Sequence, residues 1–200
     1  MTIAHHRDQV GGERLHVQAI DLWQQAGNQH AINSGRYNLA VCAQNANRHH
    51  DAVAQLQPII ASAFELQDWR RLNQSLNVRG NAYSGLHEWS LAVADYQQCV
   101  RTAWKGMASL DLASGLWNLP RALAHLRQPE TAVRLMAFAA SFWRSRFGEL
   151  SAKDHHDMRL VHRLAARQLA AARLDTLSHE GEQLSLSQAV ALALAARTQP

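Results

Sequence analysis

Glycine and proline are scarce in this chain of 200 residues, which holds ten of the first and four of the second. A β-sheet protein of this length would need many more of these residues in its turns. Alanine, leucine, glutamine and arginine are abundant instead, and all four favour helices. The composition therefore predicts an all-α fold, as one large domain or two small ones, with 47% apolar residues to build its core.

The sequence also lacks a disulfide framework, a long hydrophobic run and a cluster of like charge. Its two cysteines, Cys42 and Cys99, lie far apart in helical stretches, which is typical of buried thiols in a reducing cytoplasm. No run of about 18 apolar residues occurs, and the N-terminus lacks the apolar core of a signal peptide. The formal net charge is +4, but basic and acidic residues are interleaved. We therefore expect a cytoplasmic protein without membrane or direct nucleic-acid partners.

A repeat with a period of 40 residues organises the middle of the chain. Three Ala-Val pairs fall in register when the chain is aligned with itself at that offset, and each is followed at helical spacing by apolar residues. The pairs are Ala52-Val53, Ala92-Val93 and Ala132-Val133. A short polar break precedes each pair, and another helical pattern precedes each break. The sequence therefore predicts three pairs of antiparallel helices.

The repeat divides the chain into three parts. Residues 1–28 are expected to form a partial N-terminal repeat, consisting of a second helix only, whose uncovered face would suit a homodimer. Residues 29–148 hold the three helix-pair repeats of about 40 residues. Residues 149–200 are expected to form capping helices, because the patterns Ser151-x-x-Asp154 and Ser185-x-x-Gln188 are typical of helix starts, and the first of these helices is expected to be long.

The middle repeat resembles the tetratricopeptide family of helix–turn–helix repeats through Gly80, Tyr83, Ala92 and Tyr96. It departs from the family in its longer period and in Arg79, which stands where a leucine is common. The resemblance implies a tetratricopeptide-like right-handed superhelix of antiparallel helix pairs with a C-terminal helical cap.

The last 60 residues carry a second resemblance. They include a glycine, a Leu-Ser-Leu segment and an Ala-Val-x-x-Ala-Leu helix, formed by Gly181, Leu184, Ser185, Leu186, Ala189, Val190 and Leu194. This ending is similar to the C-terminus of the helical-repeat region in bacterial regulators of the signal-transduction ATPase type, including LuxR-like and winged-helix proteins. The resemblance implies a repeat domain that senses a ligand or partner and controls an ATPase and a DNA-binding domain. The chain has no GxxxxGK phosphate loop, so neither activity is carried over to it.

Histidine is the most abundant candidate for chemistry, with 12 residues. A helical metal site needs ligands one turn apart, yet Arg159 stands four positions after His155 and Leu160 four positions after His156. No Gly-x-Ser-x-Gly elbow occurs, and neither cysteine has a neighbouring histidine in the sequence. We therefore expect no metal, no cofactor and no catalytic residue, and an enzyme is the least favoured class.

One face of the first helix in each pair is the predicted binding surface. In stacked helix pairs these helices line the concave side, where the spacing places Tyr37, Asn77, Asn81, Trp117 and Arg121. Asparagines can hydrogen-bond an extended peptide, arginine can pair with a carboxylate or phosphate, and aromatic rings add contact area. The competing interpretation is that Tyr37 and Trp117 only pack between helices.

The predicted function is a non-enzymatic interaction or regulatory module. Its partner would be a protein or peptide, or the ATPase and DNA-binding domains of a larger regulator. The alternative is a small-molecule sensor with an apolar cavity between the repeats and the cap. Phe64 and Trp104, which are equivalent at the period of 40, are expected to close successive repeats as core residues.

Overall fold

The computed structural model of the chain describes the backbone of residues 2–198 and the side chains of residues 11–198. These residues form ten α-helices and no strand. In order they are α1 (Thr2–Gln25), α2 (Gln29–Asn45), α3 (His49–Glu65), α4 (Trp69–Gly85), α5 (Trp89–Lys105), α6 (Ser109–His125), α7 (Pro129–Phe147), α8 (Ala152–Ala165), α9 (Ala171–Glu182) and α10 (Leu186–Ala195). The predicted all-α fold is confirmed.

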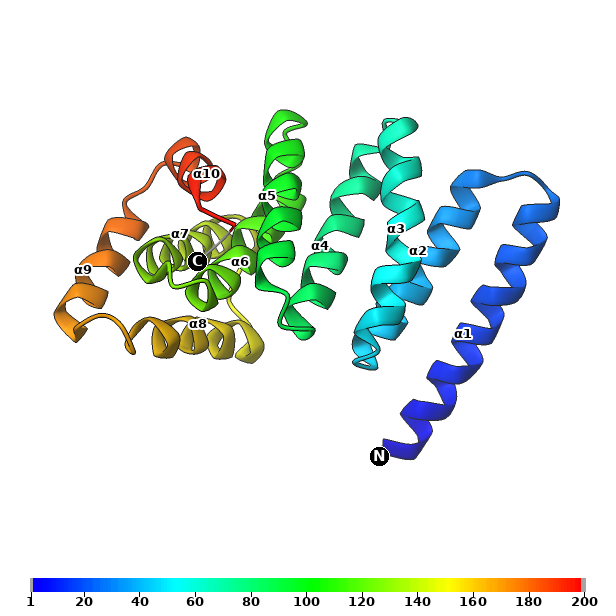
Figure 1. The fold of residues 1–200 in the computed structure, drawn as a ribbon, viewed down its shortest axis with the longest axis horizontal. Helices are drawn as coiled ribbons and strands as arrows, with labels where there is room; N and C mark the ends of the chain where they lie inside the picture. The colour runs from blue at the N-terminus through cyan, green and yellow to red at the C-terminus, as the bar shows by residue number, and fades with distance from the viewer. Residues whose placement is uncertain (1, 199–200) are drawn as a thin grey trace.

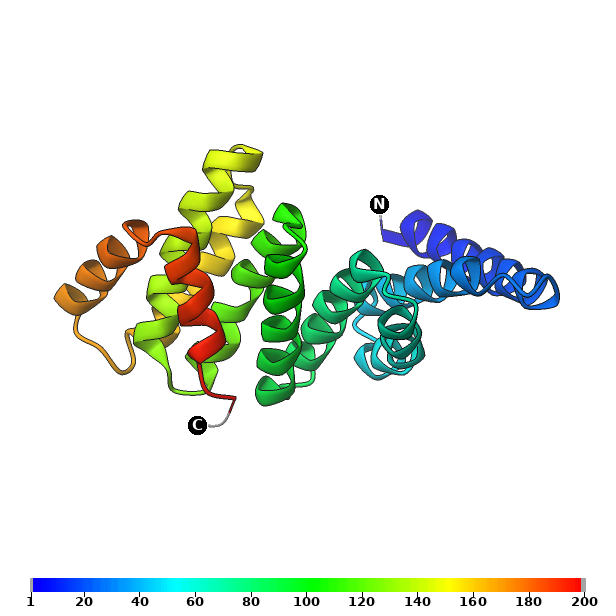
Figure 2. The same ribbon diagram turned by 90° about the horizontal axis from the view of Figure 1, so that it is seen from above.

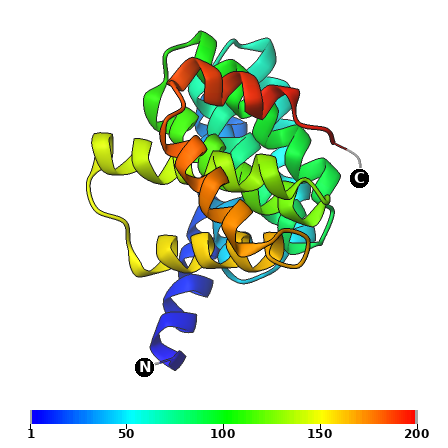
Figure 3. The same ribbon diagram turned by 90° about the vertical axis from the view of Figure 1, so that its left-hand side faces the viewer.

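The helices form a row in which each of α1 to α7 packs against the next one along the chain (Figure 1). Seen from above, α1 to α3 lie at one end of the row, and α7 to α10 gather at the other (Figure 2). A view toward that second end shows α8, α9 and α10 lying over it (Figure 3). The large contacts therefore join neighbours in the sequence, as expected of a helical repeat.

The turns of the row share one geometry. Each of α2 to α6 has 17 residues, and the three residues before the next helix include one with a left-handed backbone. These left-handed residues are Gly27, Asn47, Gln67, His87, Met107 and Arg127. The residue after each donates its N–H to a carbonyl in the last turn of the preceding helix, as Arg48 does to Ala43 at 2.8 Å. This is the Schellman ending of a helix. One helix with its turn occupies 20 residues, and two give the period of 40.

Met107 tests how strongly the turns depend on this backbone conformation. Its φ is 51°, and its side chain is 87% exposed, so the side chain contributes little packing. Met107→Gly removes the steric conflict of a left-handed L-residue, and we expect the free energy of unfolding to rise by about 1 kcal/mol. Ala94→Gly, at an exposed position inside α5, is the control and should lower it by about 1 kcal/mol. Urea unfolding measures both; a loss of stability in Met107→Gly would contradict the prediction.

The core follows the predicted register. Ala52, Ala92 and Ala132 have no exposed surface, and the large residues four positions later, Leu56, Tyr96 and Met136, are at most 1% exposed. The small residues allow close approach of neighbouring helices, and the larger ones fill the remaining space. A single large apolar cluster joins α5, α6, α7, α8 and α10, whereas α2 to α4 contain smaller separate clusters. The C-terminal half therefore holds the larger continuous core.

The C-terminal helices are shorter than the sequence suggests. The predicted long helix after Ser151 ends at Ala165, and α9 begins only at Ala171, so the expectation of one long helix is wrong. Both capping boxes are present, with Ser151 and Ser185 as the caps. The break lets the chain turn so that α9 packs on α7 and α10 reaches α5. Gln97 of α5 holds α10 by donating hydrogen bonds of 2.8 Å to the carbonyls of Ala193 and Ala196.

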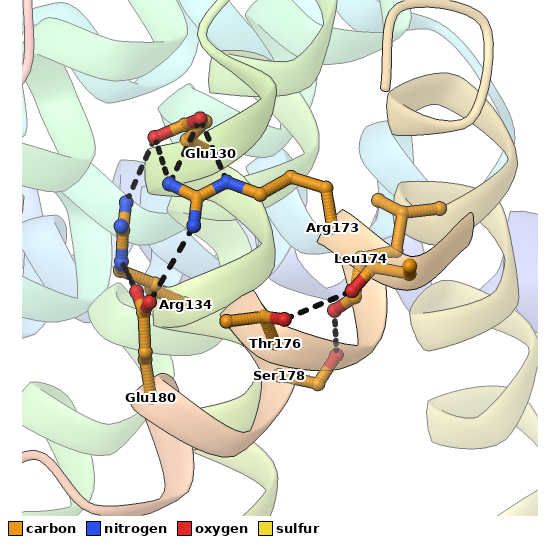
Figure 4. Close-up of polar contacts among 8 residues, drawn as sticks. Glu130, Arg134, Arg173, Leu174, Thr176, Ser178 and Glu180 are labelled. Carbon is orange, nitrogen blue, oxygen red and sulfur yellow. Dashed lines mark hydrogen bonds and ion pairs between the residues drawn. The ribbon is translucent and has the colours of Figure 1, made fainter. Parts of the chain in front are cut away.

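Four charged residues attach α9 to α7 (Figure 4). The guanidinium of Arg173 donates to both carboxylate oxygens of Glu130 at 3.0 to 3.1 Å. Arg134 donates to Glu180 at 2.6 Å. One turn away from these pairs, Gly181 approaches α7 so closely that a Cβ at this position would overlap the backbone of Arg134. The sequence-distant helices are therefore held both by paired charges and by close backbone contact.

A buried ion pair joins α4 and α5. Arg79 donates to both carboxylate oxygens of Asp95 at 2.7 Å each, and its remaining nitrogen donates to Gln57 at 2.9 Å. The Asp95 residue is only 6% exposed. Burial raises the pKa of Asp95, and the guanidinium opposes that rise. Arg79 thus takes a structural role at the position where the tetratricopeptide pattern has a leucine.

Arg79→Met should destabilise the fold more than removal of both charges. The single substitution leaves the Asp95 carboxylate buried without its partner, and we expect a loss of about 3 kcal/mol in the free energy of unfolding. The double variant Arg79→Met/Asp95→Leu buries no charge and should regain most of this loss. Urea unfolding of wild type, both single variants and the double variant gives the coupling. A double variant no more stable than Arg79→Met would contradict the buried pair.

Candidate ligand-binding groove

The largest concavity with convergent polar groups is a groove of about 500 Å³. Helices α4, α5 and α6 form its central wall, the α2–α3 turn borders one part, and α8 borders another. Three of the five predicted binding residues, Asn81, Trp117 and Arg121, line it. Positions 81 and 121 are equivalent at the period of 40, so the repeat itself places them side by side on neighbouring first helices.

A buried hydroxyl orients Asn81. The Tyr96 hydroxyl donates to Oδ1 of Asn81 at 2.7 Å, and the Ser84 hydroxyl lies 3.2 Å from the same tyrosine oxygen. Burial raises the pKa of Tyr96, so it stays a neutral donor at any physiological pH. The carbonyl oxygen of the amide is thereby occupied within the protein. Among the described residues its NH₂ group has no partner, which leaves a fixed donor for a ligand.

Asn118 is a groove residue that the sequence reasoning missed. Its amide donates to Oδ1 of Asn77 at 3.2 Å, and Asn77 in turn donates to the sulfur of Cys99 at 3.5 Å. Asn118 lies in the groove, whereas Asn77 is buried behind it at 9% exposure. The only signal in the sequence was that Asn118 directly follows Trp117, one position off the predicted stripe. The role of Asn77 in ligand contact stays a prediction, and its present role is to orient Asn118.

The two aromatic residues of the predicted stripe have different surroundings. Tyr37 is half-buried outside the groove, and the guanidinium carbon of Arg71 lies 4.8 Å from its ring centroid. Trp117 borders the groove but is only 7% exposed, and its ring centroid lies 6.0 Å from that of Trp143. Trp117 therefore combines packing between helices with one edge toward the groove. Ligand contact by Tyr37 stays a prediction.

Arg121 lies between the groove and a stack of two rings. Its guanidinium carbon is 5.8 Å from the centroid of the Trp89 ring. The Trp89 ring stacks on His125 with centroids 3.8 Å apart and an angle of 3° between the planes. Burial lowers the pKa of His125, and the positive charges of Arg121, His87 and Arg167 lower it further. This region therefore concentrates positive charge around a flat aromatic support.

The lowered pKa of His125 makes stability depend on pH. Because the folded chain binds this proton less tightly than the unfolded chain, the unfolded state takes up more protons below about pH 6.5, and the free energy of unfolding falls as the pH is lowered. His125→Phe keeps a flat ring against Trp89 but cannot titrate. We expect its stability to fall less than that of wild type between about pH 7.5 and pH 5.5. Denaturant unfolding across this range measures the difference, and parallel curves for the two proteins would contradict the prediction.

The expectation that Phe64 and Trp104 close the core is wrong. Phe64 is 59% exposed and Trp104 is 41% exposed, because the preceding residues, Ala63 and Ala103, occupy the buried positions with no exposed surface. A shift of one residue turns a side chain by about 100° around a helix, which here directs both rings outward. Phe64 instead lies edge-to-face with Trp69, with ring centroids 6.2 Å apart.

Comparisons with known proteins do not extend this description. No protein-family model matches the chain, and neither a search of curated proteins nor a search of solved structures finds a match. Within residues 2–198, no helix combines the length and apolar character needed to cross a membrane. In the same part of the chain, no three histidine, cysteine, aspartate or glutamate side chains are grouped to hold a metal ion. Arguments about function therefore depend on the groove itself.

Proposed function

We propose that the chain is a non-enzymatic interaction module that binds an extended peptide segment of a partner protein in the groove. The observation that carries this proposal is the convergence of Asn81, Trp117 and Arg121 on one groove, together with Asn118. The finer architecture inferred from the sequence is part of the proposal: a tetratricopeptide-like right-handed superhelix of antiparallel helix pairs with a C-terminal cap. Such superhelices present extended concave surfaces, which suit an extended peptide.

The groove offers the hydrogen-bonding groups that a peptide backbone needs. The NH₂ of Asn81 is a donor, and the Oδ1 of Asn118 is an acceptor, since the hydrogen bonds described above use the opposite ends of both amides. An extended peptide presents alternating carbonyl and N–H groups that match such a pair. The edge of Trp117 and the side chain of Met136 add apolar surface in the same groove. This combination of polar and apolar contacts favours binding of a peptide.

The titratable groups of the groove are engaged in ways that favour binding over catalysis. Lys153 and Asp157 pair with each other at 2.8 Å, one turn apart on α8. His49 hydrogen-bonds Gln44 at 3.0 Å. Neither Asp157 nor His49 is paired with a nucleophile, which acid–base or covalent catalysis would require. The proposal therefore assigns the chain to binding proteins.

The regulatory role is the next part of the proposal. The resemblance to bacterial signal-transduction ATPase regulators of the LuxR-like and winged-helix types is carried by residues of the C-terminal helices, where Ser185 caps α10 and Ala189 and Val190 are buried. We include in the proposal a cytoplasmic sensor or scaffold region that acts with ATPase and DNA-binding domains. Exposed Leu15, Val17 and Leu22 on α1 support self-association as a further partner state.

A small-molecule sensor is the second candidate. The groove volume of about 500 Å³ lies within the range of small-ligand sites, and Trp117 and Met136 supply apolar walls. In this case the same amides would orient one compact ligand instead of a peptide backbone.

Selection from a display library of random peptides with free C-termini tests the peptide proposal. Asn81→Asp keeps the acceptor that Tyr96 uses but removes the amide donor, so selected peptides should bind about tenfold more weakly than to wild type. Asn38→Asp makes the same charge change at an exposed position of α2 outside the groove and should leave affinity unchanged. Fluorescence anisotropy measures the dissociation constants.

Two results would count against peptide binding. The first is equal affinity of the selected peptides for wild type and Asn81→Asp. The second is failure of the library to yield any binder, while a screen of metabolites yields a compound whose binding depends on Asn81. That second result would favour the small-molecule sensor.

A further inference from the structure

Arg121 differs from the other half-buried arginines that hold helices together. Arg79 is paired with Asp95, Arg134 with Glu180, and Arg173 with Glu130, the last two as drawn in Figure 4. Arg121 has no carboxylate within 4 Å among the described residues, and its Nε is buried without a hydrogen-bond acceptor. A buried donor of this kind is costly to fold unless something else accepts from it. The chain therefore supplies a charged fork and withholds its partner.

The surroundings of Arg121 hold this fork in place without neutralising it. Trp89 lies under the guanidinium, and the stack of Trp89 on His125 fixes that ring. His87 lies beside the same indole, with ring centroids 5.4 Å apart, and Arg167 adds positive charge near His125. All of these neighbours are aromatic or basic. The local potential therefore favours an anion.

We propose that Arg121 binds a carboxylate group of the ligand, so that the groove recognises a peptide through an acidic end or an acidic side chain next to an apolar one. This inference rests on the proposed function and narrows it. A guanidinium can receive both oxygens of a carboxylate in a planar, bidentate contact. Asn118 and Trp117 lie within one turn of Arg121 on α6, where they can contact the backbone and side chain next to the carboxylate.

The charge balance of the groove selects a carboxylate over a phosphate. Arg121 is a single positive charge, and the other cation of the groove, Lys153, is already paired with Asp157. The lowered pKa of His125 leaves its ring neutral at pH 7. One uncompensated positive charge matches a monoanion, whereas a phosphate dianion would need a second cation. Inorganic phosphate therefore serves as the competing anion in the test.

Nuclear magnetic resonance of the arginine Nε–Hε groups reports directly on the proposed contact. Three probes separate the chemistry: N-acetyl-leucine has a main-chain carboxylate, N-acetyl-glutamyl amide has a side-chain carboxylate, and N-acetyl-leucinamide has neither. We expect saturable shifts of the Arg121 signal with a carboxylate probe, with a dissociation constant of about 1 mM, as such small fragments allow. The amide should bind at least about tenfold more weakly. The stronger of the two carboxylate probes identifies the source of the group.

Matched variants exclude a purely structural role for Arg121. Arg121→Gln should abolish binding of the carboxylate probes, and Arg121→Lys, which keeps the charge but loses the fork, should restore part of it. Arg101→Gln removes an exposed cation outside the groove and should change nothing. Bound carboxylate should also raise the pKa of His125 in wild type, because an anion beside the ring favours its charged form. A structural arginine would produce neither the probe dependence nor this shift.

Several results would overturn the assignment: equal binding of acid and amide, unchanged binding to Arg121→Gln, tighter binding of inorganic phosphate than of either carboxylate, or no saturable shift at all. Failure of this inference is distinguishable from failure of the proposed function. Selected peptides that depend on Asn81 but keep their affinity for Arg121→Gln, and after C-terminal amidation, would leave peptide binding intact and refute the carboxylate contact. Carboxylate probes that bind at Arg121 while no peptide is selected would give the opposite result.

Discussion

The left-handed residue in each interhelical turn is the constraint on which the rest of the structure depends. It closes every helix of the row after the same number of residues, so each helix begins 20 positions after the preceding one. Side chains 40 positions apart consequently occupy equivalent places on alternate helices. The burial of Ala52, Ala92 and Ala132, and the meeting of Asn81 with Arg121 in one groove, both follow from this regular spacing. A turn of different length would rotate every later helix and separate these groups.

Charge pairing distinguishes residues that hold the fold from residues that are available to a ligand. Arg79 satisfies a buried aspartate between α4 and α5, and Arg173 and Arg134 attach α9 to α7. Each of these guanidinium groups has its acceptor inside the protein. Arg121 has the same degree of structural support, from Trp89, but no acidic acceptor among the described residues. The arginine content of the chain thus serves two purposes, and only the presence or absence of an internal carboxylate separates them.

The sequence predicts the features that repeat and misses those that depend on one residue of rotation or on distant pairing. The Ala-Val register and the two capping boxes are visible because each is a local pattern with a fixed spacing. Phe64 and Trp104 obey the same period, yet the period alone does not say which of two adjacent residues faces inward. Asn118 and the acceptor of Arg79 escape prediction for a related reason, since their partners lie on other helices and no spacing rule connects them.

A groove built from helix interiors has a particular consequence for recognition. The turns between α1 and α7 have three residues, so no loop in this part of the chain is long enough to close over a ligand. The groove must therefore discriminate with side chains that are already fixed, as Asn81 is by Tyr96 and Asn118 is by Asn77. Most of the ordering cost then falls on the ligand, which loses its own conformational freedom when it binds. A flexible peptide bears that cost most easily where a charged group is bound first, and a fixed guanidinium at Arg121 supplies such an anchor.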